Sequence, residues 1–208
     1  MANHVITIAR GYGSGGKTIG KRLAEQLQIA YYDRDLIRIA SEESGIHERL
    51  FGQVDERVKG GLFKKAAAHR DMPAQPDSGD FVSDDNLFAL QAKTIQRLAA
   101  EQSCVIVGRC ADYVLRDQPG VVRVFIHAGK EACVRNIVDM YGVSEKEAEK
   151  SMEKIDRARS AYYRYYTGHD WDNARNYDLC LDSSRLGFDK CVDIIKGYMA
   201  ITFGSDIS

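Results

Sequence analysis

Residues 4–20 read His4-Val-Ile-Thr-Ile-Ala-Arg-Gly-Tyr-Gly-Ser-Gly-Gly-Lys-Thr-Ile-Gly20. Residues 4–9 are mostly β-branched or apolar, which predicts a β-strand buried in a core. A glycine-rich segment follows at 11–16. From 17 to 28, isoleucine and leucine recur every four positions, which predicts a helix with one buried face. A strand, a glycine-rich turn and an amphipathic helix in direct succession indicate the start of an α/β fold.

The turn at 11–18 matches Gly-x-x-x-x-Gly-Lys-Thr at every fixed position, which is the phosphate-binding P-loop pattern. Its glycines let backbone N–H groups turn toward phosphate oxygens, and the N-terminus of the next helix adds its dipole. Lys17 is expected to reach the β- and γ-phosphates, and the Thr18 hydroxyl to bind Mg²⁺. We therefore predict a site for ATP and Mg²⁺ made by Gly11, Gly13, Ser14, Gly15, Gly16, Lys17 and Thr18.

Four further apolar runs predict strands, at 29–32, 104–107, 121–126 and 177–181. They show little polar alternation and are separated by helical patterns, which is typical of a parallel sheet covered by helices on both faces. The chain has 208 residues, so we expect one domain over 1–208. The predicted fold class is α/β with a five-stranded parallel sheet.

Two segments interrupt this alternation. Between 41 and 86 there is no convincing strand, and two of the three prolines lie there, so we predict an inserted helical lobe followed by a mobile loop. Asp84 or Asp85 is expected to cap the helix after it. The second interruption runs from 144 to 176, where Ser144 and Glu147 form a capping-box pattern before a long helix rich in Arg and Tyr.

Composition excludes several classes of protein. Lys+Arg is 29 and Asp+Glu is 30, so the net charge of −1 argues against a protein that coats nucleic acid. No apolar run approaches the roughly 18 residues of a membrane span, and no signal peptide is visible. The five scattered cysteines form no C-x-x-C pair, so we expect reduced thiols in the cytoplasm, with Cys104 and Cys180 packed as small hydrophobes. The oligomeric state stays open, a homo-oligomer included.

Several stretches together resemble the cytidylate kinase-like family. They are the stretch at 4–20, Tyr31-Tyr-Asp-Arg-Asp-Leu-Ile37, Val107-Gly-Arg-Cys-Ala-Asp-Tyr-Val-Leu115, Asp156-Arg-Ala-Arg-Ser-Ala-Tyr-Tyr-Arg164 and Tyr177-Asp-Leu-Cys-Leu-Asp-Ser-Ser184. The resemblance covers nearly the whole chain and is weakest from about 44 to 80. It implies a three-layer P-loop NTPase fold, a monophosphate-binding lobe within 41–86 and an arginine-bearing lid within 144–176.

The resemblance also implies roles for single residues. Asp33, after the second strand, and Arg109, after the third, match acceptor-binding positions, although Asp33 could instead cap the next helix. Asp112 is a further acceptor-side candidate, or an acid in the first turn of a helix. Asp156 and Arg159 match the Asp and Arg of the lid. At 100° per residue, Arg159 falls on the apolar face of its helix.

Four side chains complete the predicted catalytic set. Lys17 belongs to the P-loop, and Arg159 is expected to reach the transferred phosphate from the lid. Arg157 and Arg164 point to the opposite side of the same helix and are the alternative lid arginines.

The acceptor is the open question. True cytidylate kinases carry an Asp before the Gly-Arg pair, where this chain has Val107, and Thr or Ser then Gly where it has Arg34 and Asp35; Ile39 stands in place of an arginine. Our first choice is a nucleoside monophosphate kinase acting on CMP or dCMP. The alternatives are a kinase for another small acceptor, an ATP-binding regulatory protein without turnover and, less favoured, a nucleic-acid kinase.

Overall fold

The computed structural model describes residues 3–51 and 83–204. Most of the lobe and loop predicted at 41–86 therefore lies outside the described residues. Five parallel strands form one sheet in the order β2-β3-β1-β4-β5, which confirms the predicted fold class. They are β1 (Val5–Arg10), β2 (Ala30–Tyr32), β3 (Cys104–Val107), β4 (Val121–His127) and β5 (Leu179–Asp182).

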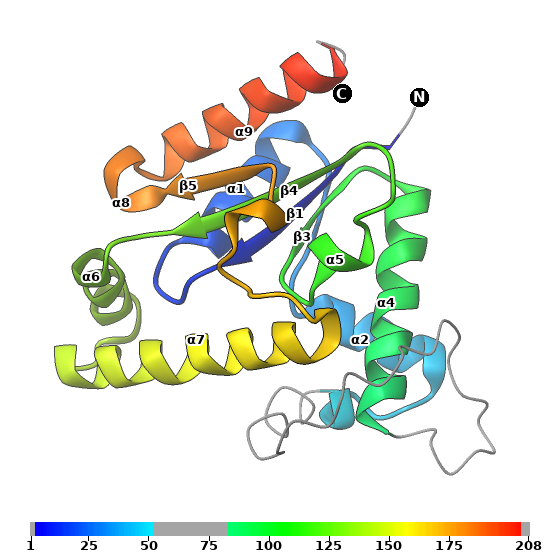
Figure 1. The fold of residues 1–208 in the computed structure, drawn as a ribbon, viewed down its shortest axis with the longest axis horizontal. Helices are drawn as coiled ribbons and strands as arrows, with labels where there is room; N and C mark the ends of the chain where they lie inside the picture. The colour runs from blue at the N-terminus through cyan, green and yellow to red at the C-terminus, as the bar shows by residue number, and fades with distance from the viewer. Residues whose placement is uncertain (1–2, 52–82, 205–208) are drawn as a thin grey trace.

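Helices cover both faces of the sheet and make three layers (Figure 1). The described helices are α1 (Gly16–Leu27), α2 (Asp35–Ser44), α4 (Asp84–Glu101), α5 (Ala111–Val114), α6 (Lys130–Tyr141), α7 (Glu145–Thr167), α8 (Ser183–Leu186) and α9 (Phe188–Phe203), with a 3₁₀ turn at Ala174–Asn176. Helices α1 and α9 pack on one face, and α4 and α5 on the other. Side chains alternate along β1 with period 2. Ile6 and Ile8 point into the core between the sheet and helices α1 and α9, and Val5 points into the core beneath α4 and α5.

The strand order decides which loops meet. Val5 pairs with Cys104 and Ile8 with Val107, so β1 and β3 end at the same edge. Strand β2 lies beside β3 and ends there too, since Tyr32 pairs with Ile106. Ligands bind at the carboxyl edge of such a sheet, where the strand order reverses. Helix α7 runs along this edge (Figure 1).

The observed helix caps match the caps predicted from the sequence in one helix and differ from them in two. Ser144 and Glu147 form the predicted capping box at the start of α7. The cap of α4 is Ser83, whose hydroxyl accepts from the Asn86 N–H, so the prediction of Asp84 or Asp85 was wrong by one or two residues. Asp33 does not cap α2, which begins after Arg34, because its carboxylate pairs with a cation of the P-loop.

The cysteine prediction holds for Cys104, which is buried, and fails for Cys180, which is exposed. Strand β5 is an edge strand whose Leu181 enters the core, and the alternating side chain at 180 therefore points to the other face. In the part of the chain that the structure describes, none of the helices has the length and apolar character needed to cross a membrane.

Candidate active site

The P-loop at 11–18 joins β1 to α1 in a tight turn. Gly13 and Gly15 have φ of 81° and 78°, the left-handed region that favours glycine. A Cβ on Gly13 would lie 2.6 Å from the Cys133 carbonyl oxygen, and one on Gly15 would lie 2.3 Å from the Phe188 ring. Glycine is therefore required at both positions by conformation and by space.

Side-chain hydrogen bonds fix the conformation of the P-loop and its position against α6. The Ser14 hydroxyl donates to the Gly11 carbonyl at 2.8 Å, so this side chain braces the turn from inside. The Asn136 side chain donates to the Gly13 carbonyl at 2.8 Å and ties the loop to α6. The first N–H groups of α1, from Gly16 onward, have no acceptor within the helix. They are the groups that a phosphate would meet.

A pocket of about 340 Å³ lies over the P-loop, and we call it the donor pocket. Its floor includes Lys17 and Thr18, and α6 supplies Met140 and Tyr141. The Tyr12 and Tyr141 rings stack at 6.3 Å, and both Met140 and Tyr141 are exposed. The pocket therefore combines phosphate-binding backbone with an aromatic and thioether wall suited to a nucleobase.

Lys17 points across the sheet edge. Its Nζ lies 2.5 Å from an Asp33 carboxylate oxygen. The Lys17 side chain is 57% exposed and the Asp33 side chain only 13%. The ammonium thus rests on a well-shielded carboxylate while remaining accessible to a nucleotide.

A magnesium ion that arrives with the nucleotide would need few protein ligands at the P-loop. No group of three His, Cys, Asp or Glu side chains within 3–51 and 83–204 is arranged to hold a metal by itself. Mg²⁺ usually keeps several waters and takes few protein ligands beside the phosphates. The Thr18 hydroxyl is the P-loop side chain that would complete such a set.

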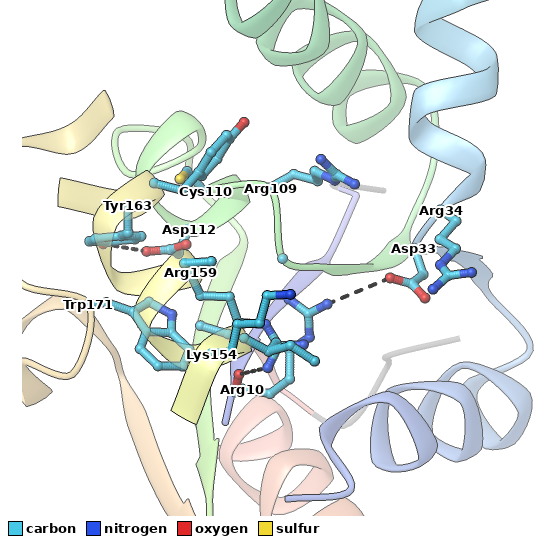
Figure 2. Close-up of a pocket in the computed structure, with 15 residues that line it drawn as sticks. Arg10, Asp33, Arg34, Arg109, Cys110, Asp112, Lys154, Arg159, Tyr163 and Trp171 are labelled. Atoms are coloured by element: carbon cyan, nitrogen blue, oxygen red, sulfur yellow. Dashed lines mark hydrogen bonds and ion pairs between the residues drawn. The ribbon is translucent and has the colours of Figure 1, made fainter. Parts of the chain in front are cut away.

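A second pocket, of about 320 Å³, lies beyond the ends of β1, β2 and β3, and we call it the acceptor pocket (Figure 2). It brings together three of the predicted acceptor residues, Asp33, Arg109 and Asp112, with Arg159 from α7. These side chains come from four separate parts of the sequence. The figure shows Arg109 and Asp33 on one side of the pocket and Asp112 on the other.

The turn that carries Arg109 is strained. Gly108, Arg109 and Cys110 have φ of 80°, 60° and 53° in succession. Such a conformation is uncommon for residues with a side chain and concentrates at functional sites. The strain directs the backbone from β3 sharply into α5 and sets Arg109 at the pocket wall.

Asp112 lies in the first turn of α5 and is 4% exposed. The Tyr163 hydroxyl donates to its carboxylate at 2.7 Å. Burial raises the pKa of Asp112, and the hydrogen bond from Tyr163 opposes that rise. Asp112 thus gives the pocket a shielded acceptor for hydrogen bonds.

Asp156 and Arg159 form the predicted pair, at 3.1 Å. The same Asp156 oxygen accepts from the Tyr12 N–H at 2.8 Å, and the Arg159 guanidinium also donates to the Arg10 carbonyl at 3.0 Å. Asp156 therefore fastens α7 to the P-loop rather than lining the acceptor pocket. Burial lowers the pKa of Arg159 despite this carboxylate.

The structure does not bring Arg157 or Arg164 into either pocket. Both side chains are exposed, and Arg164 pairs with Asp170 at 3.0 Å. They lie on the solvent face of α7 because of its helical period, as their spacing indicated. Of the three candidate lid arginines, Arg159 is the one at the site.

Sequence reasoning missed Arg10. This residue ends β1 and lines both pockets, a property shared with Arg159. Burial, followed by the nearby charge of Arg159, lowers the pKa of Arg10 to about 10. A charged residue at the end of a buried strand, directly before a P-loop, was the signal available in the sequence.

The comparisons with known proteins agree with this architecture. A family model described as "Cytidylate kinase-like family" matches residues 5–185. The chain belongs to the cytidylate kinase-like family. A cytidylate kinase from Methanopyrus kandleri is 26% identical over 202 residues, covering 92% of this chain and 91% of that protein.

Solved structures show the same fold. An uncharacterised protein from Eubacterium ventriosum is 28% identical with a TM-score of 0.69, covering 95% of this chain and 98% of the other. A shikimate kinase from Bacteroides thetaiotaomicron is 13% identical with a TM-score of 0.53, covering 94% and 98%, and shows the fold alone. This cytidylate kinase-like chain is an ATP-dependent kinase of a small acceptor.

Proposed function

We propose that the protein transfers the γ-phosphoryl group of ATP to CMP or dCMP and gives the diphosphate. The observation that carries this proposal is the meeting of two pockets at Arg10 and Arg159. One pocket is built on the P-loop, and the other has cationic and acidic ends. This arrangement suits a donor triphosphate and an acceptor placed head to head.

The charges of the acceptor pocket favour a nucleoside monophosphate. Arg109 offers a guanidinium for a phosphate, whereas Asp112, on the other side, offers a carboxylate for an amino group. Trp171 lines the same pocket and supplies an aromatic surface for a base. A pyrimidine with an exocyclic amino group satisfies both ends.

Asp112 also accounts for the unusual residue at Val107. Val107 is 1% exposed and packs in the core on the α1 and α9 side, where no base can reach it. The carboxylate that true cytidylate kinases carry before the Gly-Arg pair is therefore replaced in our proposal by Asp112, three residues beyond Arg109. The cytosine amino group would donate to Asp112.

In the proposed reaction an acceptor phosphate oxygen, ionised at neutral pH, attacks the γ-phosphorus of ATP. The bond from that phosphorus to the bridging oxygen breaks, and ADP leaves with the electron pair. Lys17, Arg109 and Arg159 hold the two phosphate groups in line and neutralise their charge, which is most of what phosphoryl transfer requires. When bound, Mg²⁺ adds charge neutralisation at the nucleotide phosphates.

An acceptor panel tests the proposal. ADP release is measured with ATP, Mg²⁺ and each of CMP, dCMP, UMP, AMP, GMP and several small hydroxyl compounds. Lys17→Ala should abolish turnover, whereas Lys21→Ala, an exposed lysine one turn further along α1, should behave as wild type. Preferential use of CMP or dCMP supports the proposal.

Other outcomes of the panel contradict it. Turnover with a hydroxyl compound alone would assign a different small acceptor. Tight ATP binding with no acceptor-dependent ADP release would favour the regulatory protein.

A further inference from the structure

The Arg10 guanidinium has a buried N–H group that none of the described residues accepts. Its side chain is 19% exposed and sits at the boundary of the donor and acceptor pockets. Its Nε is buried and has no hydrogen-bond partner among residues 3–51 and 83–204. A guanidinium with a buried unpaired N–H is costly unless an anion meets it.

Cations outnumber carboxylates around Arg10. Arg159 and Arg109 act on it as like charges, whereas Asp33 opposes them, and Asp156, which pairs with Arg159 at 3.1 Å, is a second opposite charge. That carboxylate lies 3.9 Å from Arg10 and is already in contact with Lys17 at 2.5 Å. Asp33 thus serves both Arg10 and Lys17, so these three side chains together carry one excess positive charge where the two pockets meet.

The backbone makes room for this side chain. A Cβ on Gly108 would lie 2.3 Å from an Arg10 terminal nitrogen, and one on Gly16 would lie 2.5 Å from the Arg10 Cβ. The strained turn after β3 and the first residue of α1 both approach Arg10 closely. Arg10 also stands on the central strand of the sheet, so its position is set before any ligand binds.

We propose that Arg10 is a catalytic residue that binds the transferring phosphoryl group where the donor and acceptor pockets meet. The inference rests on the proposed phosphoryl transfer. In the transition state the negative charge spreads over the equatorial oxygens of that group, and a fixed guanidinium beside them stabilises it without reorganisation. Arg159 contributes from α7, and Arg10 from the sheet.

Kinetics of Arg10→Gln test the role directly. We expect kcat to fall about 100-fold or more, the usual loss for a preorganised donor, while the KM values of ATP and CMP change less than about threefold. Arg10→Lys should recover part of kcat because it retains the charge without the planar fork. Arg116→Gln, the same change at an exposed arginine beside Asp117, should match wild type.

Thermal stability separates catalysis from packing. Loss of a buried cation beside Arg109 and Arg159 relieves repulsion, so Arg10→Gln should melt at the wild-type temperature or above it. A lower melting temperature with normal kcat would make Arg10 structural and overturn the proposal.

A binding experiment does not depend on the acceptor. Inorganic tetrapolyphosphate carries two more phosphoryl groups than pyrophosphate, and Arg10 lines the donor pocket together with the P-loop, so we expect the longer ion to depend on Arg10 more strongly. By calorimetry, Arg10→Gln should weaken tetrapolyphosphate about tenfold and pyrophosphate less than twofold, as expected for one lost charged hydrogen-bond partner. Equal binding of tetrapolyphosphate by wild type and variant would overturn the inference. If wild type phosphorylates no acceptor, the proposed function fails, and this comparison still tests Arg10.

Discussion

Replacing Asp33 by asparagine tests whether this carboxylate competes with the nucleotide for Lys17. In the structure the Lys17 ammonium rests 2.5 Å from Asp33. We expect the ammonium to turn toward the phosphates when ATP binds. Breaking the Lys17–Asp33 pair then reduces the free energy of ATP binding. The substitution Asp33→Asn keeps the shape of the side chain and removes its charge.

The magnitude follows from distance and exposure. Two unit charges 2.5 Å apart attract by roughly 1.7 kcal/mol at the dielectric constant of water. The Lys17 side chain is 57% exposed, so solvent screening and the entropy of a long side chain reduce the net value to about 1 kcal/mol. The variant should therefore bind ATP about fivefold more tightly.

The assay is calorimetric titration of a slowly hydrolysed ATP analogue with Mg²⁺, at low and at high salt. The gain in affinity should shrink at high salt because exposed charges are screened. Asp189→Asn is the matched control: its carboxylate lies 2.5 Å from Arg22 but is 79% exposed and lies on α9. It should leave ATP affinity unchanged.

One result would refute the reasoning. If Asp33→Asn binds ATP as wild type does, or more weakly, Asp33 does not restrain Lys17. The carboxylate would then hold the ammonium in the position that the phosphates need. A rise in the KM of CMP in the same variant would support the acceptor role that the family pattern implies for Asp33.

Three further variants address the rest of the site. Arg109→Ala should raise the KM of the acceptor by a factor of roughly 10 to 160, which corresponds to about 1.5–3 kcal/mol, and leave the KM of ATP nearly unchanged; equal effects in steady-state kinetics would place Arg109 outside the acceptor site. Arg159→Lys should lower kcat tenfold or more, about 1.4 kcal/mol, with little change in melting temperature because an ammonium can still reach Asp156; early melting with normal turnover would make Arg159 structural. Burial raises the pKa of Asp112 above its ordinary 3.8, so the folded protein keeps the carboxyl protonated to a higher pH than the unfolded chain does. The free energy of unfolding therefore falls as the pH rises from about 4. Asp112→Asn should therefore be more stable than wild type in urea at pH 7, with a gap that narrows toward pH 4; a constant gap would contradict the assignment.

Local patterns in the sequence determined most of the fold. The five strands are visible as apolar runs because strands buried on both faces need such runs, and all five occur within two residues of the expected bounds. The P-loop is recognisable from its fixed positions, Gly11, Gly16, Lys17 and Thr18, and a Cβ on Gly16 would lie only 2.5 Å from the Arg10 Cβ. The capping box of Ser144 and Glu147 is equally local. Each of these signals acts within a few residues.

The roles of Asp33 and Cys180 depended on tertiary contacts. The sequence left Asp33 as an acceptor-binding residue or a helix cap, and Lys17 from another element is close enough to pair with its carboxylate. Cys180 looked like a core residue, but strand order placed β5 at the edge of the sheet, with one face uncovered at that position. Propensity cannot separate such cases, because the competing partner is distant in sequence.

The active site was decided by the strand order β2-β3-β1-β4-β5. It brings Arg10, Asp33 and Arg109 to one edge, and the Asp156 contact with the P-loop adds Arg159. The sequence pointed to three of these four side chains, because Asp33 and Arg109 follow predicted strands, Arg159 lies on the apolar face of a predicted helix, and all three match positions of the family that the chain resembles. Arg10 gained its meaning only when the other cations were placed around it. Charge interactions depend on distance through space, and that distance is set by the packed sheet and not by position along the chain.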